Sequence, residues 1–266
     1  MPEITGTTRL IAIIADPIAH VRTPQVMNRR FLELGIDAVM VPLHVSPGSL
    51  SSVLTGLRQV RNFSGAVITV PHKMAAAGLC DDLSTEARLV GAVNCLRPGP
   101  DGTLVGAMFD GRGFVNGLLV RDIDPAGQSA LVLGAGGAAS AVAVALAAAG
   151  VARLTIHNRT PGKAQELAAR IASAFPAVQV SEGPADGRTM TLVVNGTSLG
   201  MHDGDPLPLP IDTLDVGTVV AEVVMQPEET ALLRAAAAAG CHIHPGRYML
   251  EGQLGMLADY VSGREQ

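Results

Sequence analysis

The chain has 266 residues, enough for one large domain or two ordinary ones, and 48% of them are apolar while only 3% are aromatic. Its net charge of −5 and pI of about 5.8 argue against nucleic acid or an anionic membrane surface as a partner. The three cysteines have no metal-like or redox-like spacing and the N-terminus lacks the features of a signal peptide, so we expect a soluble cytoplasmic protein. We also expect a monomer or a homodimer.

Short apolar runs alternate with helical patterns through the first hundred residues. We expect strands at residues 9–15, 38–45 and 63–70, and helices at residues 23–36, 49–60 and 84–90. Strands that alternate with helices indicate parallel βαβ units. Two further apolar runs, at residues 91–96 and 103–109, flank the turn-forming sequence RPGPDG, which predicts a hairpin-like connection.

The pattern of apolar and polar residues changes after Asp110, which indicates the start of a second unit. It begins with a helix over residues 111–123, and a strand, a glycine turn and a long helix follow over residues 129–150. Later strands are expected at residues 153–160, 191–201 and 217–225, and an amphipathic helix over residues 248–261 closes the chain. The sequence therefore predicts two α/β units, with the closing helix folding back on the first.

The glycine turn is the clearest motif in the chain. The sequence GAGGAA, from Gly134 to Ala139, lies between a strand and a helix and matches the dinucleotide-binding fingerprint, with alanine in the third small position. Gly134 permits the tight turn, and Gly136 lets the backbone approach a pyrophosphate at the positive end of the helix. We therefore assign Gly134, Gly136, Gly137 and Ala138 to a nucleotide cofactor. The alternative is a glycine-rich turn that binds no ligand.

The next strand indicates which nucleotide is bound. An NAD-binding unit usually ends this strand with Asp or Glu, which holds the ribose 2′-hydroxyl. Here the strand ends in HNRTPGK, so that Arg159 replaces the acid, with Asn158, Thr160 and Lys163 nearby. A guanidinium fork suits a 2′-phosphate, and these residues predict NADP. The alternative is an ordinary exposed arginine before a helix that Thr160 caps.

Lys73 lies in an otherwise apolar or small stretch, two residues after Pro71 and just past an expected strand. Lysines are mostly exposed and are rarely buried without a partner. Taken alone, Lys73 is interpreted as an ordinary lysine at the end of a strand, with its amine extending into water. Asp110, taken alone, could equally cap the helix that follows it.

Polar residues follow several of the expected strands, and ligands gather at the carboxyl ends of strands in open parallel sheets. In chain order the stretches read ADPIAHVRTPQVMN, VITVPHK, GAVNCL, GAMFDGRG, GAGGAA, HNRT, NGTSLGM and GRYMLEGQ. This series resembles the shikimate dehydrogenase family over nearly the whole chain.

The resemblance implies a fold and an activity. The fold has an N-terminal α/β substrate domain with a mostly parallel sheet, a Rossmann-type NADP domain, and C-terminal helices that return to the first domain. We expect the substrate domain at residues 1–107 and 240–266 and the NADP domain at residues 108–239. The expected activity is the NADP-dependent, reversible oxidation of shikimate, a small cyclic polyol carboxylate, to its 3-dehydro ketone.

The resemblance also implies roles for single residues. The catalytic lysine and aspartate fall on Lys73 and Asp110, which together can bind a hydroxyl group and relay its proton. Substrate-binding positions fall on Thr23, Thr69, Asn94 and Gln253. Gly246 and Met249 fall beside the nicotinamide, and Asn195, Thr197 and Met201 fall in the loop that borders the cofactor.

Some donors of the family pattern are absent. The family usually has His-Ser-x-Ser-Pro, whose hydroxyls hold the substrate carboxylate, where this chain has His20-Val21-Arg22-Thr23-Pro24. Met225 replaces a tyrosine, and Phe109 replaces a polar residue before the catalytic aspartate. Thr23 can still donate, and Arg22 could pair with a carboxylate. We therefore expect conserved chemistry with a weakened or shifted substrate preference, towards quinate, an amino-substituted shikimate or another cyclic polyol.

Two other readings stay open. The chain could be a non-catalytic NADP-binding sensor with a degenerate substrate pocket, or an unrelated two-domain NADP enzyme such as a folate-type dehydrogenase. His242 and His244 alternate on one face of an expected strand near Cys241. Zinc would need two more ligands at suitable spacing, and we expect no metal.

Overall fold

The computed structural model describes residues 3–19 and 21–264. The chain divides into two compact units, unit 1 from Met1–Phe109 with Leu254–Gln266 and unit 2 from Asp110–Gln253. Among the described residues, no helix combines the length and the apolar character needed to cross a lipid bilayer. The boundaries expected from the sequence, after residues 107 and 239, divide the chain by function and stay a prediction.

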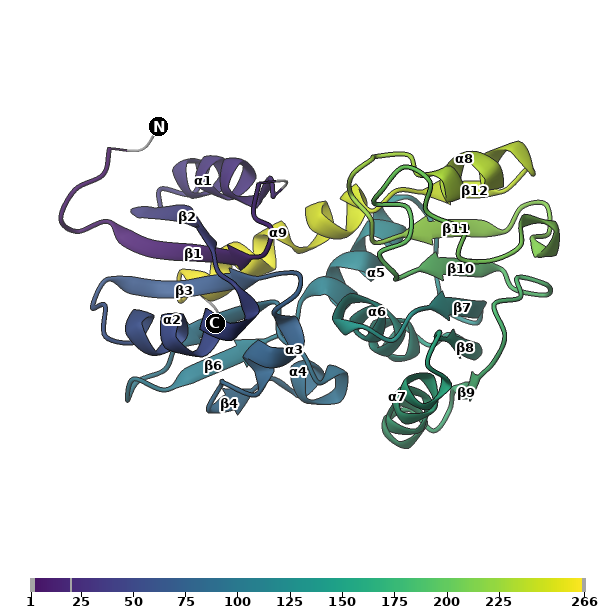
Figure 1. The fold of residues 1–266 in the computed structure, drawn as a ribbon, viewed down its shortest axis with the longest axis horizontal. Helices are drawn as coiled ribbons and strands as arrows, with labels where there is room; N and C mark the ends of the chain where they lie inside the picture. The colour runs from purple at the N-terminus through teal and green to yellow at the C-terminus, as the bar shows by residue number, and fades with distance from the viewer. Residues whose placement is uncertain (1–2, 20, 265–266) are drawn as a thin grey trace. The chain divides into compact units, whose positions relative to one another are not determined.

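Unit 1 is built on a mixed six-stranded sheet with the strand order β2-β1-β3-β5-β6-β4 (Figure 1). Its strands are β1 (Arg9–Ala15), β2 (Ala38–His44), β3 (Phe63–Ile68), β4 (Asp82–Leu83), β5 (Cys95–Pro98) and β6 (Leu104–Ala107). β1 pairs in parallel with β2 and β3, whereas β5 runs antiparallel to β3 and β6. The start of β5 therefore lies at the same edge of the sheet as the end of β3.

Helices cover both faces of this sheet. They are α1 (Thr23–Glu33), the 3-10 helix η1 (Pro47–Ser49), α2 (Leu50–Leu57), α3 (Lys73–Ala77), α4 (Thr85–Val90) and the last turns of α9 (Arg247–Val261). Phe31 of α1 and Leu257 of α9 belong to one buried cluster with Ile11 and Ile13 of β1. Figure 1 shows α2 in front of the sheet and α9 behind it.

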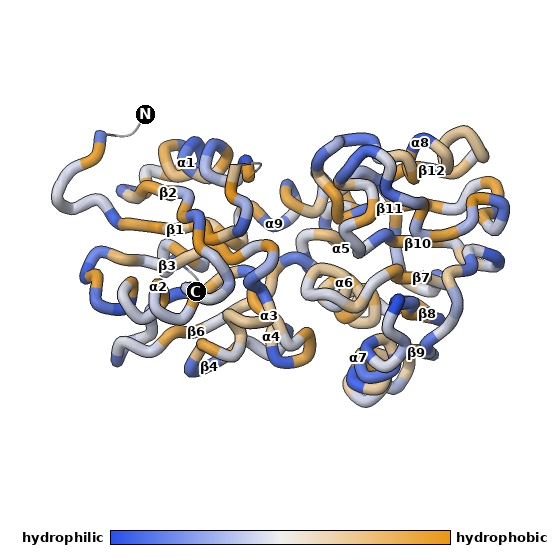
Figure 2. Tube along the Cα trace, in the orientation of Figure 1, coloured by the Kyte–Doolittle hydropathy of each residue, from blue (hydrophilic) through white to orange (hydrophobic). Residues whose placement is uncertain are grey.

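The burial of each strand follows its sequence. β1 is a continuous apolar run whose last five residues are buried, as a central strand of a covered parallel sheet requires. β2, at the edge, alternates between buried and more exposed residues. Figure 2 shows apolar colour along most of β1.

Unit 2 contains a six-stranded sheet, all parallel, in the order β12-β11-β10-β7-β8-β9. Its strands are β7 (Ser129–Leu133), β8 (Arg153–His157), β9 (Gln179–Glu182), β10 (Leu192–Asn195), β11 (Val219–Glu222) and β12 (His242–His244). Its helices are α5 (Asp110–Val120), α6 (Gly137–Ala148), α7 (Pro161–Ala174), the 3-10 helix η2 (Ile211–Thr213), α8 (Ala231–Ala238) and the first turns of α9. All six strands end at one edge of the sheet, because they are parallel.

Two packing contacts fix the helices of unit 2. Leu232 and Leu233 of α8 belong to a buried cluster with Leu131 of β7 and Val193 of β10. Gly111 brings α5 close to α6, since a Cβ atom at this position would lie 2.1 Å from the carbonyl oxygen of Ala141.

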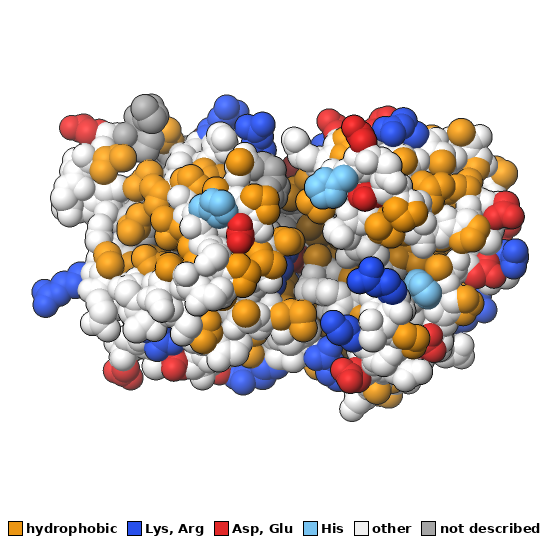
Figure 3. Space-filling view, in the orientation of Figure 1, with side chains coloured by type: hydrophobic (Ala, Val, Ile, Leu, Met, Phe, Trp, Pro, Cys, Tyr) orange, Lys and Arg blue, Asp and Glu red, His pale blue; other side chains and the backbone are white. Residues whose placement is uncertain are grey.

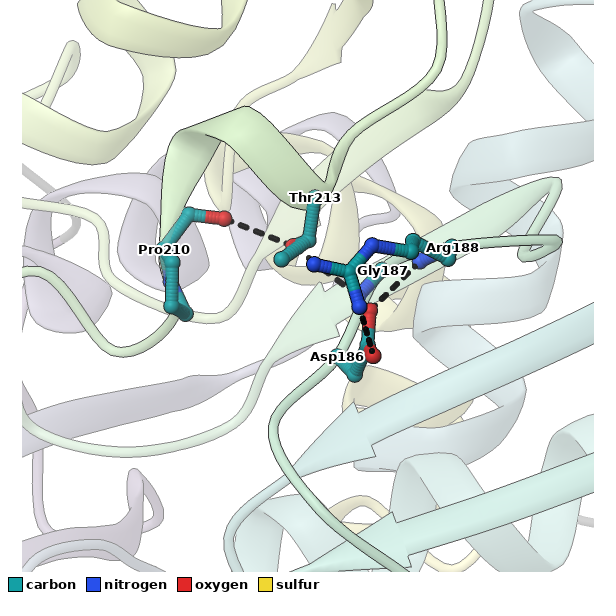
Figure 4. Close-up of polar contacts among 5 residues, drawn as sticks. All are labelled: Asp186, Gly187, Arg188, Pro210 and Thr213. Atoms are coloured by element: carbon teal, nitrogen blue, oxygen red, sulfur yellow. Dashed lines mark hydrogen bonds and ion pairs between the residues drawn. The ribbon is translucent and has the colours of Figure 1, made fainter.

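A polar network holds the chain before β10 and β11 begin (Figure 4). The amide of Gly187 donates to Thr213 Oγ1 at 3.0 Å, and this hydroxyl donates to the carbonyl of Pro210 at 2.6 Å. Beside it, Arg188 Nη1 pairs with Asp186 Oδ2 at 3.0 Å. The network lies towards the amino ends of these strands and so serves the fold, opposite the edge where the strands end.

The predicted two-unit α/β fold is confirmed, with several differences in detail. The hairpin expected around residues 97–102 is formed by β5 and β6. Strand β3 ends at Ile68, two residues before the end expected from the sequence, and Lys73 opens a helix that was not predicted. The short strands β4 and β9 and the alanine-rich helix α8 were also not predicted.

Candidate cofactor and substrate site

The glycine turn has the conformation that the fingerprint requires. Gly134, directly after β7, has φ +108°, a left-handed value that favours glycine. Gly136 occupies the N-cap position of α6, where no side chain caps the first amides, and a Cβ atom there would meet nothing within 4 Å. Gly137 and Ala138 form the first turn. An anion can therefore approach the N-terminal amides of α6.

The residues predicted to select NADP lie together between β8 and α7. Asn158 Nδ2 donates to the carbonyl of Thr160 at 2.9 Å, which folds the connection into a compact turn. Thr160 occupies the N-cap position of α7, but its side chain makes no capping hydrogen bond. Arg159 and Lys163 are exposed, and neither side chain forms a hydrogen bond or ion pair with a described residue. Figure 3 shows Lys and Arg side chains gathered over the α7 side of unit 2.

The loop after β10 is organised by Asn195, which is fully buried. Its amide nitrogen donates to the carbonyl of Leu199 at 3.0 Å and to Glu222 Oε1 at 2.9 Å. Its amide oxygen accepts from the backbone and hydroxyl of Thr197, at 3.1 and 2.6 Å. Met201, at the far end of the loop, is 36% exposed. Thr197 is thus held by the loop itself, and Met201 lies at its surface.

Gly246 and Met249 lie where α9 begins. A Cβ atom at Gly246 would lie 2.3 Å from the carbonyl oxygen of Val224, so the chain passes too close to the end of β11 for any larger residue. The amide of Met249 donates to the carbonyl of Gly246 at 3.1 Å, and Met249 is 5% exposed. These contacts hold both residues beside the edge where the strands of unit 2 end.

Unit 1 brings Thr69, Lys73 and Asn94 together at the edge where β3 ends. Thr69 follows β3, and its amide donates to Ile14 at the end of β1. The carbonyl of Lys73 accepts from the amide of Val93 at 2.9 Å, which joins α3 to the residues before β5. Asn94 is 3% exposed, and its Oδ1 accepts from the amide of Phe109 at 2.9 Å. Three predicted site residues therefore share one small region of unit 1.

Unit 2 joins two more of the predicted residues, Asp110 and Gln253. Asp110 is the first residue of α5 and is 3% exposed, and Gln253 Nε2 donates to its Oδ1 at 3.2 Å. Gly113 permits this contact, since a Cβ atom there would lie 2.7 Å from the Gln253 Cβ. Gln253 thus fixes the Asp110 carboxyl group at the start of α5.

Comparison with known proteins gives matches along most of the chain. Residues 13–96 match the model described as "Shikimate dehydrogenase substrate binding domain", and residues 119–198 match "Shikimate / quinate 5-dehydrogenase". The chain is 42% identical to a shikimate dehydrogenase (NADP(+)) of Rubrobacter xylanophilus, over 94% of this chain and 89% of that protein.

The chain belongs to the shikimate dehydrogenase family.

Solved structures of the family and of a related reductase have the same fold. The shikimate 5-dehydrogenase of Thermus thermophilus, in complex with NADP(H) and shikimate, is 32% identical with a TM-score of 0.86, covering 96% of this chain and 94% of that one. The ligand-free 5-ketofructose reductase of a Gluconobacter strain is 32% identical with a TM-score of 0.84, covering 97% and 94%. The two-domain fold expected for the shikimate dehydrogenase family is thus shown.

The residues that depart from the pattern of the shikimate dehydrogenase family differ in their surroundings. Val21 packs against the buried cluster of unit 1, and Phe109 lies in that cluster with its ring 5.4 Å from the Tyr260 ring. Thr23 is 7% exposed at the start of α1, whereas Arg22 is exposed. In unit 2, Met225 is 42% exposed. His20 lies outside the described residues.

Sequence reasoning on this member of the shikimate dehydrogenase family missed Glu222. This residue ends β11, is 0% exposed and accepts a hydrogen bond from Asn195, as described above. Burial raises the pKa of its carboxyl group above the usual value, because the charged form is poorly solvated. The signal was present in the sequence, since an acid at the end of an apolar run is as unexpected as Lys73 after β3.

Proposed function

We propose that this chain catalyses the NADP-dependent, reversible oxidation of shikimate, or of a closely related cyclic polyol carboxylate, to its 3-dehydro ketone. The observation that supports this most strongly is the similarity to an NADP-dependent shikimate dehydrogenase over nearly the whole chain. The geometry agrees with it. The turn after β7 exposes the N-terminal amides of α6, and the turn after β8 presents a cation, Arg159, where NAD-binding units have an acid.

The proposed reaction gives a role to Lys73, Asp110 and Asn94. The oxidation removes a hydride from carbon and a proton from the hydroxyl oxygen, and NADP supplies the hydride acceptor when it is bound. Lys73 and Asp110 would hold the reacting hydroxyl and take its proton. Asn94 would bind a neighbouring hydroxyl. Because Lys73 belongs to unit 1 and Asp110 to unit 2, the proposal requires both units to contact one substrate.

The two lysines of the chain, Lys73 and Lys163, provide a matched test. Lys73→Ala should lower kcat for NADP reduction with shikimate by about a hundred-fold or more, since general acid–base groups contribute on that order, and should leave the NADP dissociation constant unchanged. Lys163→Ala should show the opposite pattern, with a higher KM for NADP and a nearly unchanged kcat. Wild-type turnover by Lys73→Ala would remove Lys73 from the mechanism.

A second candidate substrate class is a neutral polyol or ketose without a carboxylate. Val21 and Phe109 pack into the apolar cluster of unit 1 where the family pattern has donors, and the chain also resembles a 5-ketofructose reductase. Initial rates with shikimate, quinate and a polyol–ketose panel separate the two classes. A kcat/KM for shikimate above that for every neutral substrate supports the first class, and the reverse order supports the second. Turnover of none of them would favour the NADP-binding sensor.

We also propose that the protein works in a reducing cytoplasm, as a monomer or a homodimer. In the described part of the chain, Cys80, Cys95 and Cys241 form no disulfide with one another, as expected where thiols stay reduced. Burial raises the pKa of the Cys80 thiol to about 11, so little reactive thiolate forms at neutral pH.

A further inference from the structure

Glu222 and Asn195 meet because of the register between two strands. Both residues end their strands, and in the parallel pairing of β10 with β11 they stand opposite each other. Side chains at paired positions of parallel strands point to the same face, which brings the carboxyl group to the amide. Both residues are 0% exposed. Burying a carboxyl group costs free energy unless the group is hydrogen-bonded.

Glu222 and the carbonyl of Leu199 together determine which way the Asn195 amide faces. The Glu222 Oε1 atom is an acceptor, so the Asn195 nitrogen must point towards it, and the Asn195 oxygen then faces the Thr197 amide and hydroxyl. If the amide rotated by half a turn, its NH₂ group would face the Thr197 N–H, and two donors would meet. The acceptor on Glu222 therefore reinforces, from outside the loop, the amide orientation that folds the loop from Asn195 to Met201.

This loop lies directly against the glycine turn. The amide of Gly196 donates to the carbonyl of Leu133 at 2.8 Å, at the end of β7. A Cβ atom at Gly196 would lie 2.6 Å from the Cβ of Ala139, and one at Gly134 would lie 3.2 Å from the Gly196 carbonyl. A displacement of the loop by a few tenths of an ångström would therefore move the residues that surround the cofactor site.

The second carboxyl oxygen of Glu222, Oε2, takes no part in the contact with Asn195. Its Oε2 atom is buried without a hydrogen-bond partner among the described residues. Close by, Thr230 accepts from the amide of Leu233 at 3.2 Å and caps α8, and a Cβ atom at Gly200 would lie 3.2 Å from the Thr230 Cβ. Thr230 also lies close enough to lower the pKa of the Glu222 carboxyl group, but the contact with Asn195, at 2.9 Å, is the one that joins this carboxyl group to a loop residue directly.

We propose that Glu222 is a positioning residue for the nicotinamide cofactor, which acts by orienting Asn195 and thereby holding the loop from Asn195 to Met201 against the glycine turn. This inference rests on the proposed function in one respect, that the turn after β7 binds NADP. It concerns cofactor binding and is independent of which polyol is oxidised.

The test compares Glu222→Leu, which removes the acceptor and keeps apolar bulk, with Glu222→Gln, which keeps an acceptor oxygen. Glu222→Leu should raise both the dissociation constant and the KM for NADP about ten-fold, while kcat and the KM for shikimate change less than about three-fold. Glu222→Gln should bind NADP within about two-fold of wild type. A general structural role would instead lower the melting temperature and kcat in both variants.

Three results would overturn the inference. They are unchanged NADP binding by Glu222→Leu, a Glu222→Gln variant as weak as Glu222→Leu, and additive effects of Glu222→Leu and Asn195→Ala in the double variant, because residues that act through one interaction are not additive. If Glu222→Leu does not fold, Asn195→Ala decides in its place, and wild-type NADP binding by that variant contradicts the proposal. Wild type that binds NADP but does not oxidise shikimate disproves the proposed substrate only, whereas wild type that does not bind NADP disproves both proposals.

Discussion

Arg159 is exposed, follows β8, and forms no hydrogen bond or ion pair with a described residue. If its guanidinium binds the 2′-phosphate, Arg159→Ala should raise the KM for NADP by about ten-fold or more, since a hydrogen bond to a charged group contributes about 1.5–3 kcal/mol. The KM for NAD, which lacks this phosphate, should change less than about two-fold. Initial rates with both cofactors measure the difference.

Arg170 is the matched control, because it is an exposed arginine on α7, the helix that follows Arg159. Arg170→Ala should change neither KM by more than about two-fold, since it is far from the turn in sequence and on a solvated helix. Equal losses with NADP and NAD in Arg159→Ala would show that Arg159 does not recognise the phosphate.

Single residues differ in how well the sequence predicts their surroundings. The glycine turn could be predicted from the sequence, because its conformation depends on neighbours in the chain. Gly134 has the left-handed φ that the motif requires. The contact between Asn195 and Glu222 could not be predicted from the sequence, because it joins residues 27 positions apart and depends on strand register. The apolar packing of Val21 likewise depends on α9, from the other end of the chain.

At the scale of elements, His244 marks the junction of β12, α5 and α9. Its ring lies 5.9 Å from the Phe114 ring and 4.8 Å from the Tyr248 ring, and its Nε2 is buried without a partner among the described residues. Burial, with a smaller contribution from the charge of Arg121, lowers the pKa of His244 from 6.5 to about 4. This packing therefore disfavours protonation of His244.

The consequence is a loss of stability in acid. Between pH 6.5 and about 4, the unfolded state binds a proton at His244 that the folded state does not, so the free energy of unfolding falls as the pH is lowered. The full effect is about 3 kcal/mol. His244→Phe keeps an aromatic ring and should lose less stability than wild type between pH 7 and pH 5, as measured by denaturant unfolding. Parallel pH profiles for the two proteins would contradict this.

Helices and strands could be predicted where their burial produces a regular pattern of apolar residues in the sequence. The central strands β1, β3, β7, β10 and β11 are nearly continuous apolar runs, and each was predicted. β9 is an edge strand with mostly exposed residues, and β4 has two residues, so neither carries a periodic signal. α3 is short and follows Pro71, where the apolar sequence resembles the end of a strand.

At the scale of the whole molecule, the chain builds unit 1 from both of its ends. α9 begins in unit 2, where Gln253 contacts Asp110, and ends in unit 1, where Tyr260 donates to the carbonyl of Val105 at 2.8 Å. The sequence predicted this return of the closing helix, first as part of the two-unit pattern and then through the family resemblance. The proposed catalytic pair likewise draws one residue from each unit, which no local pattern can show.

The most direct test of the account is the structure of the dead-end complex of this protein with NADPH and shikimate, in which both ligands are reduced and no hydride can transfer. The account predicts that Lys73 Nζ and a carboxylate oxygen of Asp110 both lie within about 3 Å of one shikimate hydroxyl, whose carbon faces the nicotinamide. A complex with both ligands bound, in which either group is too far away to reach that hydroxyl, would contradict it.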